Sequence, residues 1–141
     1  MSMSRVEPAL RWAFPLLTLA WAVFLFWVST STRGAEAAIG ASPDAFDQLV
    51  PSAAHLGGYG VLAGLLLLSV WAWAARSRPW VPLVVSFVVP ALYGGALELY
   101  QATLVNRAGT WGDAALNATG AAAALAALTV LRWWRTSTAL R

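Results

Sequence analysis

Four long apolar stretches alternate with short polar or charged segments along the chain. They cover residues 12–32, 51–75, 80–104 and 113–131. A helix of about 20 apolar residues is long enough to cross the hydrocarbon core of a bilayer. The pattern therefore predicts an all-α membrane protein in which four transmembrane helices form a single domain, residues 1–141.

The first apolar stretch has a second interpretation, as part of a cleavable signal peptide. Arginines precede it, and Ala35-Glu36-Ala37, shortly after it, has the small-x-small form of a cleavage site. The apolar stretch is longer than the about 7–15 residues that are usual in signal peptides. We therefore expect a retained helix, followed by a polar connection over residues 33–54.

The third apolar stretch contains residues that interrupt helices in water, namely Pro82, Pro90 and the pair Gly94-Gly95. Transmembrane helices tolerate such residues when neighbouring groups satisfy the freed backbone carbonyls. We expect a single helix with a kink near Pro90.

Composition and charge place the chain in a membrane and set its orientation. The chain is 60% hydrophobic and 11% charged, and all nine basic residues are arginines. Cytoplasmic flanks of membrane helices carry the excess of basic residues. Two arginines, Arg33 and Arg107, fall on one side; the other seven fall on the opposite side: Arg5, Arg11, Arg76, Arg78, Arg132, Arg135 and Arg141. Both termini are therefore predicted to be cytoplasmic.

Tryptophans support the same boundaries, because tryptophan is enriched where a bilayer meets water. Trp27 and Trp111 lie near the predicted outer boundary, and six others lie near the arginine-rich one: Trp12, Trp71, Trp73, Trp80, Trp133 and Trp134. The excess of Ala, Arg and Trp points to a bacterium with a GC-rich genome. The expected location is thus the bacterial cytoplasmic membrane, which the chain crosses several times.

Several function classes are excluded by residues that the chain lacks. Without cysteine there is no disulfide, thiol nucleophile or cysteine-bound metal, and without lysine there is no Walker-type phosphate site or Schiff base. The arginines flank apolar runs instead of forming a patch, so we expect no nucleic-acid partner. No Rossmann fingerprint, paired-histidine zinc motif or nucleophile-elbow serine is present.

Polar residues at helical spacing mark the outer ends of the second and third apolar stretches. His55 and Tyr59 are four residues apart, and Glu98 and Gln101 are three apart. Residues with these spacings share one face of a helix. Each pair therefore presents its polar groups on one side, near the predicted outer boundary.

The fourth apolar stretch begins with a similar pair, Asp113 and Asn117, and the same face continues with the small residues Gly120 and Ala124. Small residues let a neighbouring membrane helix approach closely. Arg107 lies in the short link just before this stretch. Polar residues from three stretches thus meet at one membrane boundary.

Two interpretations of these residues remain open. Ionisable groups within membrane helices are costly, so they normally face the bundle interior or a water-filled cavity, where they pair or act. The structural alternative is that Asp113 caps its helix, Glu98 forms an ion pair with Arg107, and His55 is a packed polar residue. In either case we expect Glu98 to contact Arg107, Asp113 or His55, because an isolated carboxylate at this depth is penalised.

The order and spacing of these residues resemble the VanZ-like family of membrane proteins. The resemblance covers about 70 residues, from His55 to Ala124, and rests on His55, Tyr59, Glu98, Gln101, Arg107, Asp113, Asn117 and Gly120. One departure is that Pro51-Ser52 stands where the family often has an Asp-Lys pair. The resemblance implies a cell-envelope role, since the founding member is associated with resistance to the glycopeptide teicoplanin.

The leading hypothesis is a protein that binds, or acts on, a lipid-linked or amphiphilic molecule at a polar cleft facing outward. In an enzyme, Glu98 or Asp113 would serve as general base, His55 as acid or ligand, and Arg107 would hold a phosphate. Substrate contacts are expected from Arg107, Gln101, Asn117 and Tyr59. Alternatively, His55, Glu98 and Asp113 could hold a divalent cation such as Mg²⁺ or Mn²⁺.

Two further hypotheses belong to other classes. A non-enzymatic resistance factor would sequester an amphiphilic antibiotic, or shield its target, through the same cleft. A small transporter would need ionisable groups near the membrane midplane, whereas here they gather at one end. The sequence leaves open whether the protein is an enzyme, and it does not determine the oligomeric state.

Overall fold

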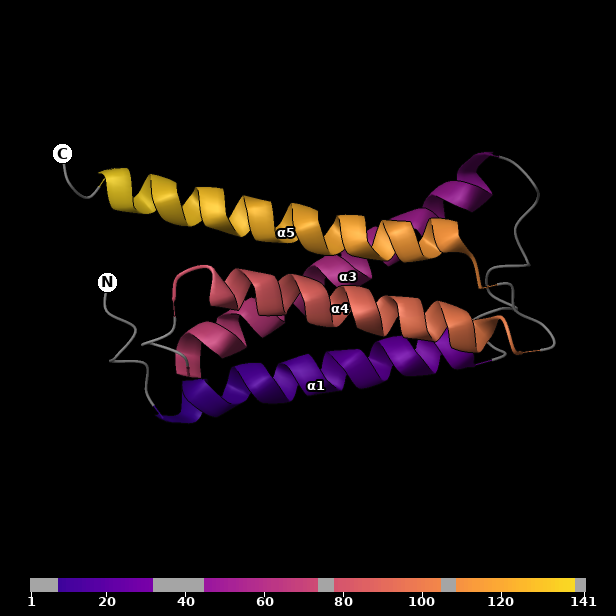
Figure 1. The fold of residues 1–141 in the computed structure, drawn as a ribbon, viewed down its shortest axis with the longest axis horizontal. Helices are drawn as coiled ribbons and strands as arrows, with labels where there is room; N and C mark the ends of the chain where they lie inside the picture. Colours follow the sequence, from indigo (N-terminus) through magenta and orange to yellow (C-terminus); the bar gives the residue numbers. More distant parts are fainter. Residues whose placement is uncertain (1–7, 32–44, 74–77, 105–108, 139–141) are drawn as a thin grey trace.

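The computed structural model describes residues 8–31, 45–73, 78–104 and 109–138, with side chains described from 11 in the first segment and from 51 in the second. Every regular element in these segments is a helix (Figure 1): α1 (Pro8–Thr30), α3 (Ala45–Trp73), α4 (Val81–Gln101) and α5 (Trp111–Thr138). The possible cleavage site at Ala35-Glu36-Ala37 lies outside the described residues.

All four helices are long and apolar enough to cross a membrane, which confirms the predicted fold class. The spans are Arg11–Thr30, Pro51–Trp73, Val81–Gln101 and Trp111–Thr138, with mean hydropathy between 1.6 and 1.8. The chain is therefore an all-α protein with four candidate transmembrane helices.

Three helices extend beyond the apolar stretches that predict them, the first being α1, which begins at Pro8. Helix α3 begins at Ala45 and includes Pro51, so the predicted connection over residues 33–54 ends earlier than expected. Helix α5 continues past Leu131 to Thr138, where hydroxyl groups donate to carbonyls one turn back, as from Ser137 to Trp133 (2.9 Å). The apolar pattern marks the membrane-spanning part of a helix, whereas backbone hydrogen bonding can continue into the polar flank.

Helix α3 lies at the centre of the bundle and packs against each of the other three helices. Helices α1 and α5 lie on opposite sides of it, with α4 between them (Figure 1). One buried cluster joins α3 and α5 through Ala63, Leu67, Ala121 and Leu125. Helix α4 runs as one continuous helix through Pro90.

The closest approach between α3 and α5 occurs at the small residues that the sequence places on one face of α5. A methyl group added at Gly120 would collide with the backbone of Leu56, and one added at Gly60 would lie 3.2 Å from the Gly120 carbonyl oxygen. The prediction that this face admits a neighbouring helix is confirmed. Close backbone approach increases van der Waals contact, which drives helix association in lipid.

Helix α1 has little buried surface, and it is joined to its neighbours by the packing of Leu25 against Tyr59 and Leu62 and by hydrogen bonds between helices. Its Trp21 indole donates to the Gly58 carbonyl of α3 at 2.8 Å, and Tyr93 of α4 donates to the Ala22 carbonyl at 2.7 Å. Such bonds hold membrane helices together where burial of apolar surface provides no driving force.

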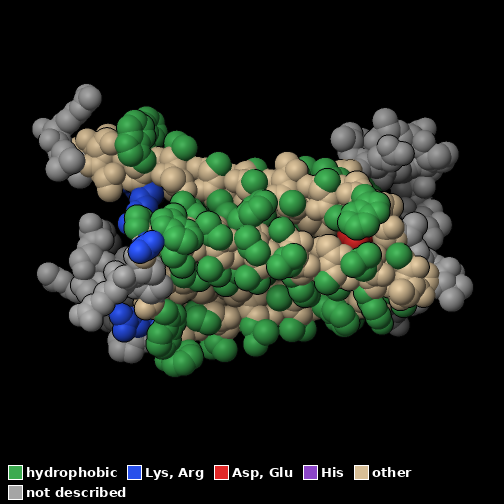
Figure 2. All heavy atoms as spheres, in the orientation of Figure 1, with side chains coloured by type: hydrophobic (Ala, Val, Ile, Leu, Met, Phe, Trp, Pro, Cys, Tyr) green, Lys and Arg blue, Asp and Glu red, His purple; other side chains and the backbone are tan. Residues whose placement is uncertain are grey.

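The two ends of the bundle differ in charge. Helix α1 begins and α5 ends at the same end of the molecule (Figure 1). Basic side chains gather at that end and an acidic side chain shows at the opposite one (Figure 2); the described arginines are Arg11, Arg78, Arg132 and Arg135. We call these the arginine end and the polar end. The chain therefore runs up and down the bundle, as the arginine count predicts, while the side that faces the cytoplasm stays a prediction.

Candidate functional site

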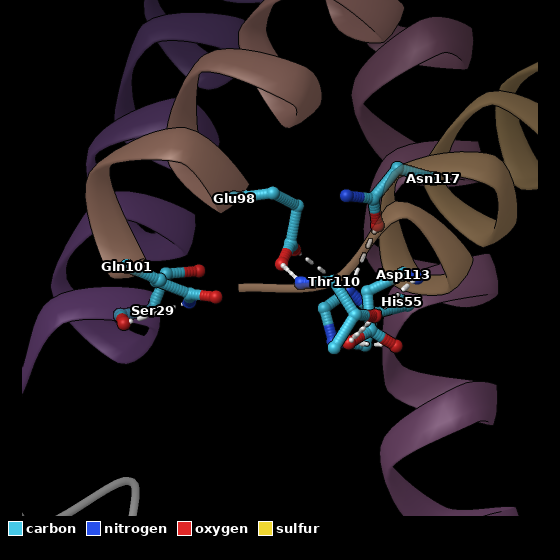
Figure 3. Close-up of polar contacts among 7 residues, drawn as sticks. All are labelled: Ser29, His55, Glu98, Gln101, Thr110, Asp113 and Asn117. Carbon is cyan, nitrogen blue, oxygen red and sulfur yellow. Dashed lines mark hydrogen bonds and ion pairs between the residues drawn. The ribbon is translucent and has the colours of Figure 1, made fainter. Parts of the chain in front are cut away.

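Five residues from three helices and one link come together at the polar end. They are His55 of α3, Glu98 of α4, Thr110 just before α5, and Asp113 and Asn117 of α5 (Figure 3). We call this group the polar cluster. Four of the five are residues that the sequence singles out as candidate site residues.

The two ring nitrogens of His55 have different neighbours. Nδ1 lies 2.8 Å from Asn117 Oδ1 and 3.9 Å from Glu98 Oε1, while Nε2 lies 4.0 Å from Asp113 Oδ1. An amide oxygen only accepts hydrogen bonds, so Nδ1 carries the proton in the bond to Asn117. In the neutral ring this leaves the Nε2 lone pair facing the Asp113 carboxylate, free to accept a proton or to bind a cation.

Glu98 is the buried carboxylate of the polar cluster, with 7% of its side chain exposed. Its Oε2 accepts a hydrogen bond from the Thr110 backbone N–H at 3.2 Å. The link makes this bond by passing close to the end of α4, where a methyl group on Gly109 would collide with the Glu98 carbonyl oxygen. Of the predicted partners of Glu98, His55 lies beside it, with Nδ1 3.9 Å from Oε1, whereas the hydrogen bond from Thr110 was not predicted.

The two carboxylate oxygens of Asp113 have different surroundings. The Thr110 hydroxyl accepts a hydrogen bond from the Asp113 N–H at 3.0 Å and donates to Asp113 Oδ2 at 2.7 Å. Thr110 thus caps the N-terminus of α5, and Asp113 supports the cap. The sequence placed the cap at Asp113, whereas Thr110 is the capping residue, and Asp113 Oδ1 faces His55 Nε2 at 4.0 Å.

Thr110 is the member of the polar cluster to which sequence reasoning assigned no role. The signal was available, because Thr110-x2-Asp113 immediately before an apolar run has the form of a capping box. Its hydroxyl and its backbone N–H bond two different carboxylates. It therefore fixes the positions of Glu98 and Asp113 relative to each other.

Asn117 is fully buried and only half satisfied. Its Oδ1 bonds His55, whereas Nδ2 has no hydrogen-bond partner among the described residues. Figure 3 shows the amide nitrogen directed to the side where Glu98 lies. Gly94 leaves room for it, since a methyl group there would lie 2.9 Å from Nδ2. A buried donor without an acceptor costs about 1–3 kcal/mol in stability. An acceptor for Asn117 Nδ2 would remove this cost.

The structure shows two of the remaining candidate residues, Gln101 and Tyr59, and neither forms a hydrogen bond to the polar cluster in the described part of the chain. Gln101 is buried and its amide donates to the Ser29 carbonyl of α1 at 2.9 Å. Tyr59 is buried in the core next to Tyr93, with ring centroids 6.4 Å apart. Arg107 lies outside the described residues, so the predicted pair with Glu98 does too.

The polar cluster is open on one side. His55 and Asp113 have 24% and 32% of their side chains exposed, against 7% for Glu98. One ligand atom from each of these three residues lies within 4.8 Å of the others. Two carboxylates and an imidazole at this spacing can bind a cation, exchange protons with a bound molecule, or accept its hydrogen bonds.

A separate apolar groove of about 480 Å³ lies between α4 and α5, towards the arginine end. Its wall includes Leu83, Phe87, Leu125 and Val130. These residues come from the first part of α4 and the last part of α5. The groove is thus distinct from the polar cluster and contains none of its members.

Fold and site together define a four-helix membrane protein with a convergent polar cluster at one end of the bundle. No family model, no curated protein and no solved structure matches the chain. The likeness to VanZ-like proteins therefore rests on the spacing of the quoted residues alone.

Proposed function

We propose that this protein binds the polar head of an amphiphilic, lipid-linked molecule of the bacterial cell envelope. The observation that carries the proposal is the convergence of His55, Glu98 and Asp113 from three helices, graded from exposed to buried. Such a gradient suits a site that a head group enters from the membrane boundary while its apolar part stays in lipid.

The orientation proposed for the site follows from the arginines. The described arginines lie at the opposite end of the bundle, and basic flanks are retained in the cytoplasm. On this basis the polar cluster faces the outer leaflet of the cytoplasmic membrane. The VanZ-like spacing supports a molecule of envelope assembly or an amphiphilic glycopeptide such as teicoplanin as ligand.

A second candidate is an enzyme that acts on a phosphate-bearing head group. The observation that favours it is the hydrogen bond from His55 Nδ1 to Asn117, which leaves Nε2 as an acceptor beside Asp113. In this role Nε2 takes a proton from an attacking water or hydroxyl group. Binding without turnover needs no such free acceptor.

Native mass spectrometry of the protein purified in mild detergent tests the proposal. We expect wild type to retain an amphiphile, and Glu98→Gln and Asp113→Asn to retain at least about tenfold less per folded protein, because charge-assisted hydrogen bonds to the head are lost. Asp47→Asn is the matched control, since it removes one charge from α3 about 12 Å of helix away from His55.

Equal retention by all four proteins would contradict the proposal. If a retained molecule carries phosphate, incubating it with the protein and measuring released phosphate separates the two candidates. Release that disappears in His55→Gln supports the enzyme, and stable retention without release supports binding alone.

A further inference from the structure

We propose that His55 Nε2, Glu98 and Asp113 hold one divalent transition-metal ion of the Mn²⁺ or Zn²⁺ class. Metal binding as such needs only these side chains, whereas its use in handling a head group rests on the proposed function. Four features support this assignment: the spacing of the three groups, the hydrogen bond made by His55 Nδ1, the amide of Asn117, and the distribution of charge.

The distances between His55, Glu98 and Asp113 are too long for hydrogen bonds, but they suit a metal ion bound between the three side chains. One ligand atom from each of His55, Glu98 and Asp113 lies within 4.8 Å of the others, and His55 Nε2 is 4.0 Å from Asp113 Oδ1. Hydrogen bonds are shorter than this. Ligands at about 2.0–2.2 Å from a metal ion lie about 3–4.4 Å from each other, depending on the angle between them. A small inward movement of the side chains therefore completes the coordination.

The hydrogen bond between His55 and Asn117 orients the imidazole ring for metal binding. Histidine ligands usually donate their second ring N–H to an oxygen atom, which fixes the tautomer and the ring orientation. Here Nδ1 donates to the buried Asn117 Oδ1 at 2.8 Å. The opposite nitrogen, Nε2, is the one that faces Asp113.

The Nδ2 of Asn117, which is directed toward Glu98 but makes no hydrogen bond to it, is a second indication of a ligand. The side chain is fully buried, Nδ2 has no partner among the described residues, and Figure 3 shows it directed to the side of Glu98. An amide N–H does not bind a metal, but it donates to an oxygen atom that does. A metal-bound hydroxide or a phosphoryl oxygen in an open coordination position would satisfy it.

The charges of the polar cluster also call for a cation. Glu98 and Asp113 both lie near the membrane boundary around a histidine whose Nδ1 proton is already used. The arginines of the described segments lie at the other end of the bundle. Arg107, in the link outside these segments, is the competing source of positive charge, so the experiment must include it.

The ligand set indicates the kind of ion. One imidazole with two carboxylates is intermediate between the oxygen sites of Mg²⁺ and the nitrogen-rich sites of Cu²⁺, which favours Mn²⁺ or Zn²⁺. Three protein ligands leave positions open for water or for an oxygen of a bound anion. A phosphate or carboxylate head group could therefore be held by the ion together with Asn117.

The test is a titration of the full chain, purified in detergent and treated with EDTA, with Mn²⁺ while free Mn²⁺ is measured by electron paramagnetic resonance. We expect one ion per chain, displaced by Zn²⁺. Glu98→Gln, Asp113→Asn and His55→Gln should each raise the Kd at least about tenfold. Asp47→Asn should leave the Kd unchanged, and Arg107→Gln should leave it unchanged or lower it.

Size-exclusion profiles and thermal unfolding of each variant exclude misfolding as the cause of weak binding. A metal-dependent rise in the unfolding temperature of wild type, absent in Glu98→Gln, provides a second readout. Absence of binding by folded wild type, or equal binding by the ligand variants, overturns the inference. Amphiphile retention after EDTA treatment would then still support the proposed function, whereas metal binding without any retained amphiphile would support the inference alone.

Discussion

At the scale of single residues, Thr110 and Asp113 combine helix capping with a position in the polar cluster. Asp113 uses Oδ2 for the Thr110 hydroxyl and presents Oδ1 to His55. Thr110 uses its hydroxyl for the cap and its backbone N–H for Glu98. Two substitutions can therefore separate stability from ligand binding. Thr110→Val removes the cap and keeps both carboxylates, whereas Asp113→Asn keeps the cap and removes one negative charge.

Thr110→Val removes the capping hydroxyl but keeps the backbone N–H that bonds Glu98. We expect the free energy of unfolding to fall by about 0.5–2 kcal/mol, the usual contribution of an N-cap. Amphiphile retention per folded protein should fall by less than in Asp113→Asn, because both carboxylates remain although the hydroxyl no longer holds Asp113 Oδ2. Chemical unfolding in detergent micelles and native mass spectrometry measure the two quantities.

Asp113→Asn should give the opposite result. The asparagine keeps the size and can still accept the Thr110 hydroxyl bond, so stability stays within about 0.5 kcal/mol of wild type. Retention of the amphiphile falls, because an amide carries no charge and is a poor metal ligand. A loss of stability without a loss of retention would show that Asp113 is a capping residue only.

At the scale of helices, contact between α3 and α5 depends on backbone approach at Gly120. Gly120→Ala places a methyl group against the backbone of Leu56, which cannot move as a flexible side chain would. We expect a loss of about 1–3 kcal/mol in unfolding free energy from this overpacking. Reversible unfolding by SDS in mixed micelles measures it.

Gly95→Ala in α4 is the matched control for this change. A methyl group there meets nothing within 4 Å, so only the intrinsic preference of alanine for a helix remains. Stability should stay unchanged or rise by about 0.5–1 kcal/mol. Equal destabilisation by both substitutions would contradict the close approach of α3 and α5.

The attachment of α1 depends partly on a few side-chain hydrogen bonds. Tyr93→Phe removes the bond to the Ala22 carbonyl and little else. We expect a loss of about 0.6 kcal/mol, because that carbonyl also accepts a bond within its own helix. Tyr100→Phe, at a half-exposed tyrosine near the end of α4, should have a smaller effect in the same unfolding assay.

At the scale of the whole molecule, the separation of charge between the two ends predicts the orientation in the membrane. The chain has no cysteine, so single cysteines can be introduced without a background. A cysteine at Ser42 should react with an impermeant maleimide in intact cells, and one at Ser137 should react only after the cells are opened, because the arginine end stays inside. The reverse pattern would place the polar cluster on the cytoplasmic side.

The four apolar spans seen in the described residues were predictable from the sequence, because a bilayer demands about 20 apolar residues for each crossing. Which residues share a helix face was predictable as well, since spacings of three and four residues fix it. On this ground His55, Glu98, Asp113 and Asn117 were singled out, and Gly120 was predicted to admit a neighbouring helix. The extent of α3 towards Ala45 was not predictable, because hydropathy does not register a helix outside the membrane.

Only the tertiary structure decided which of these faces meet. Spacing along one helix does not determine how that helix is rotated and tilted against its neighbours, since many rotations bury similar apolar area in lipid. Packing at Gly120 brings His55 to Asn117, whereas Gln101 bonds α1 and Tyr59 lies in the core. The sequence by itself thus determined four helices with polar faces at one end, and helix packing decided which polar groups form the site.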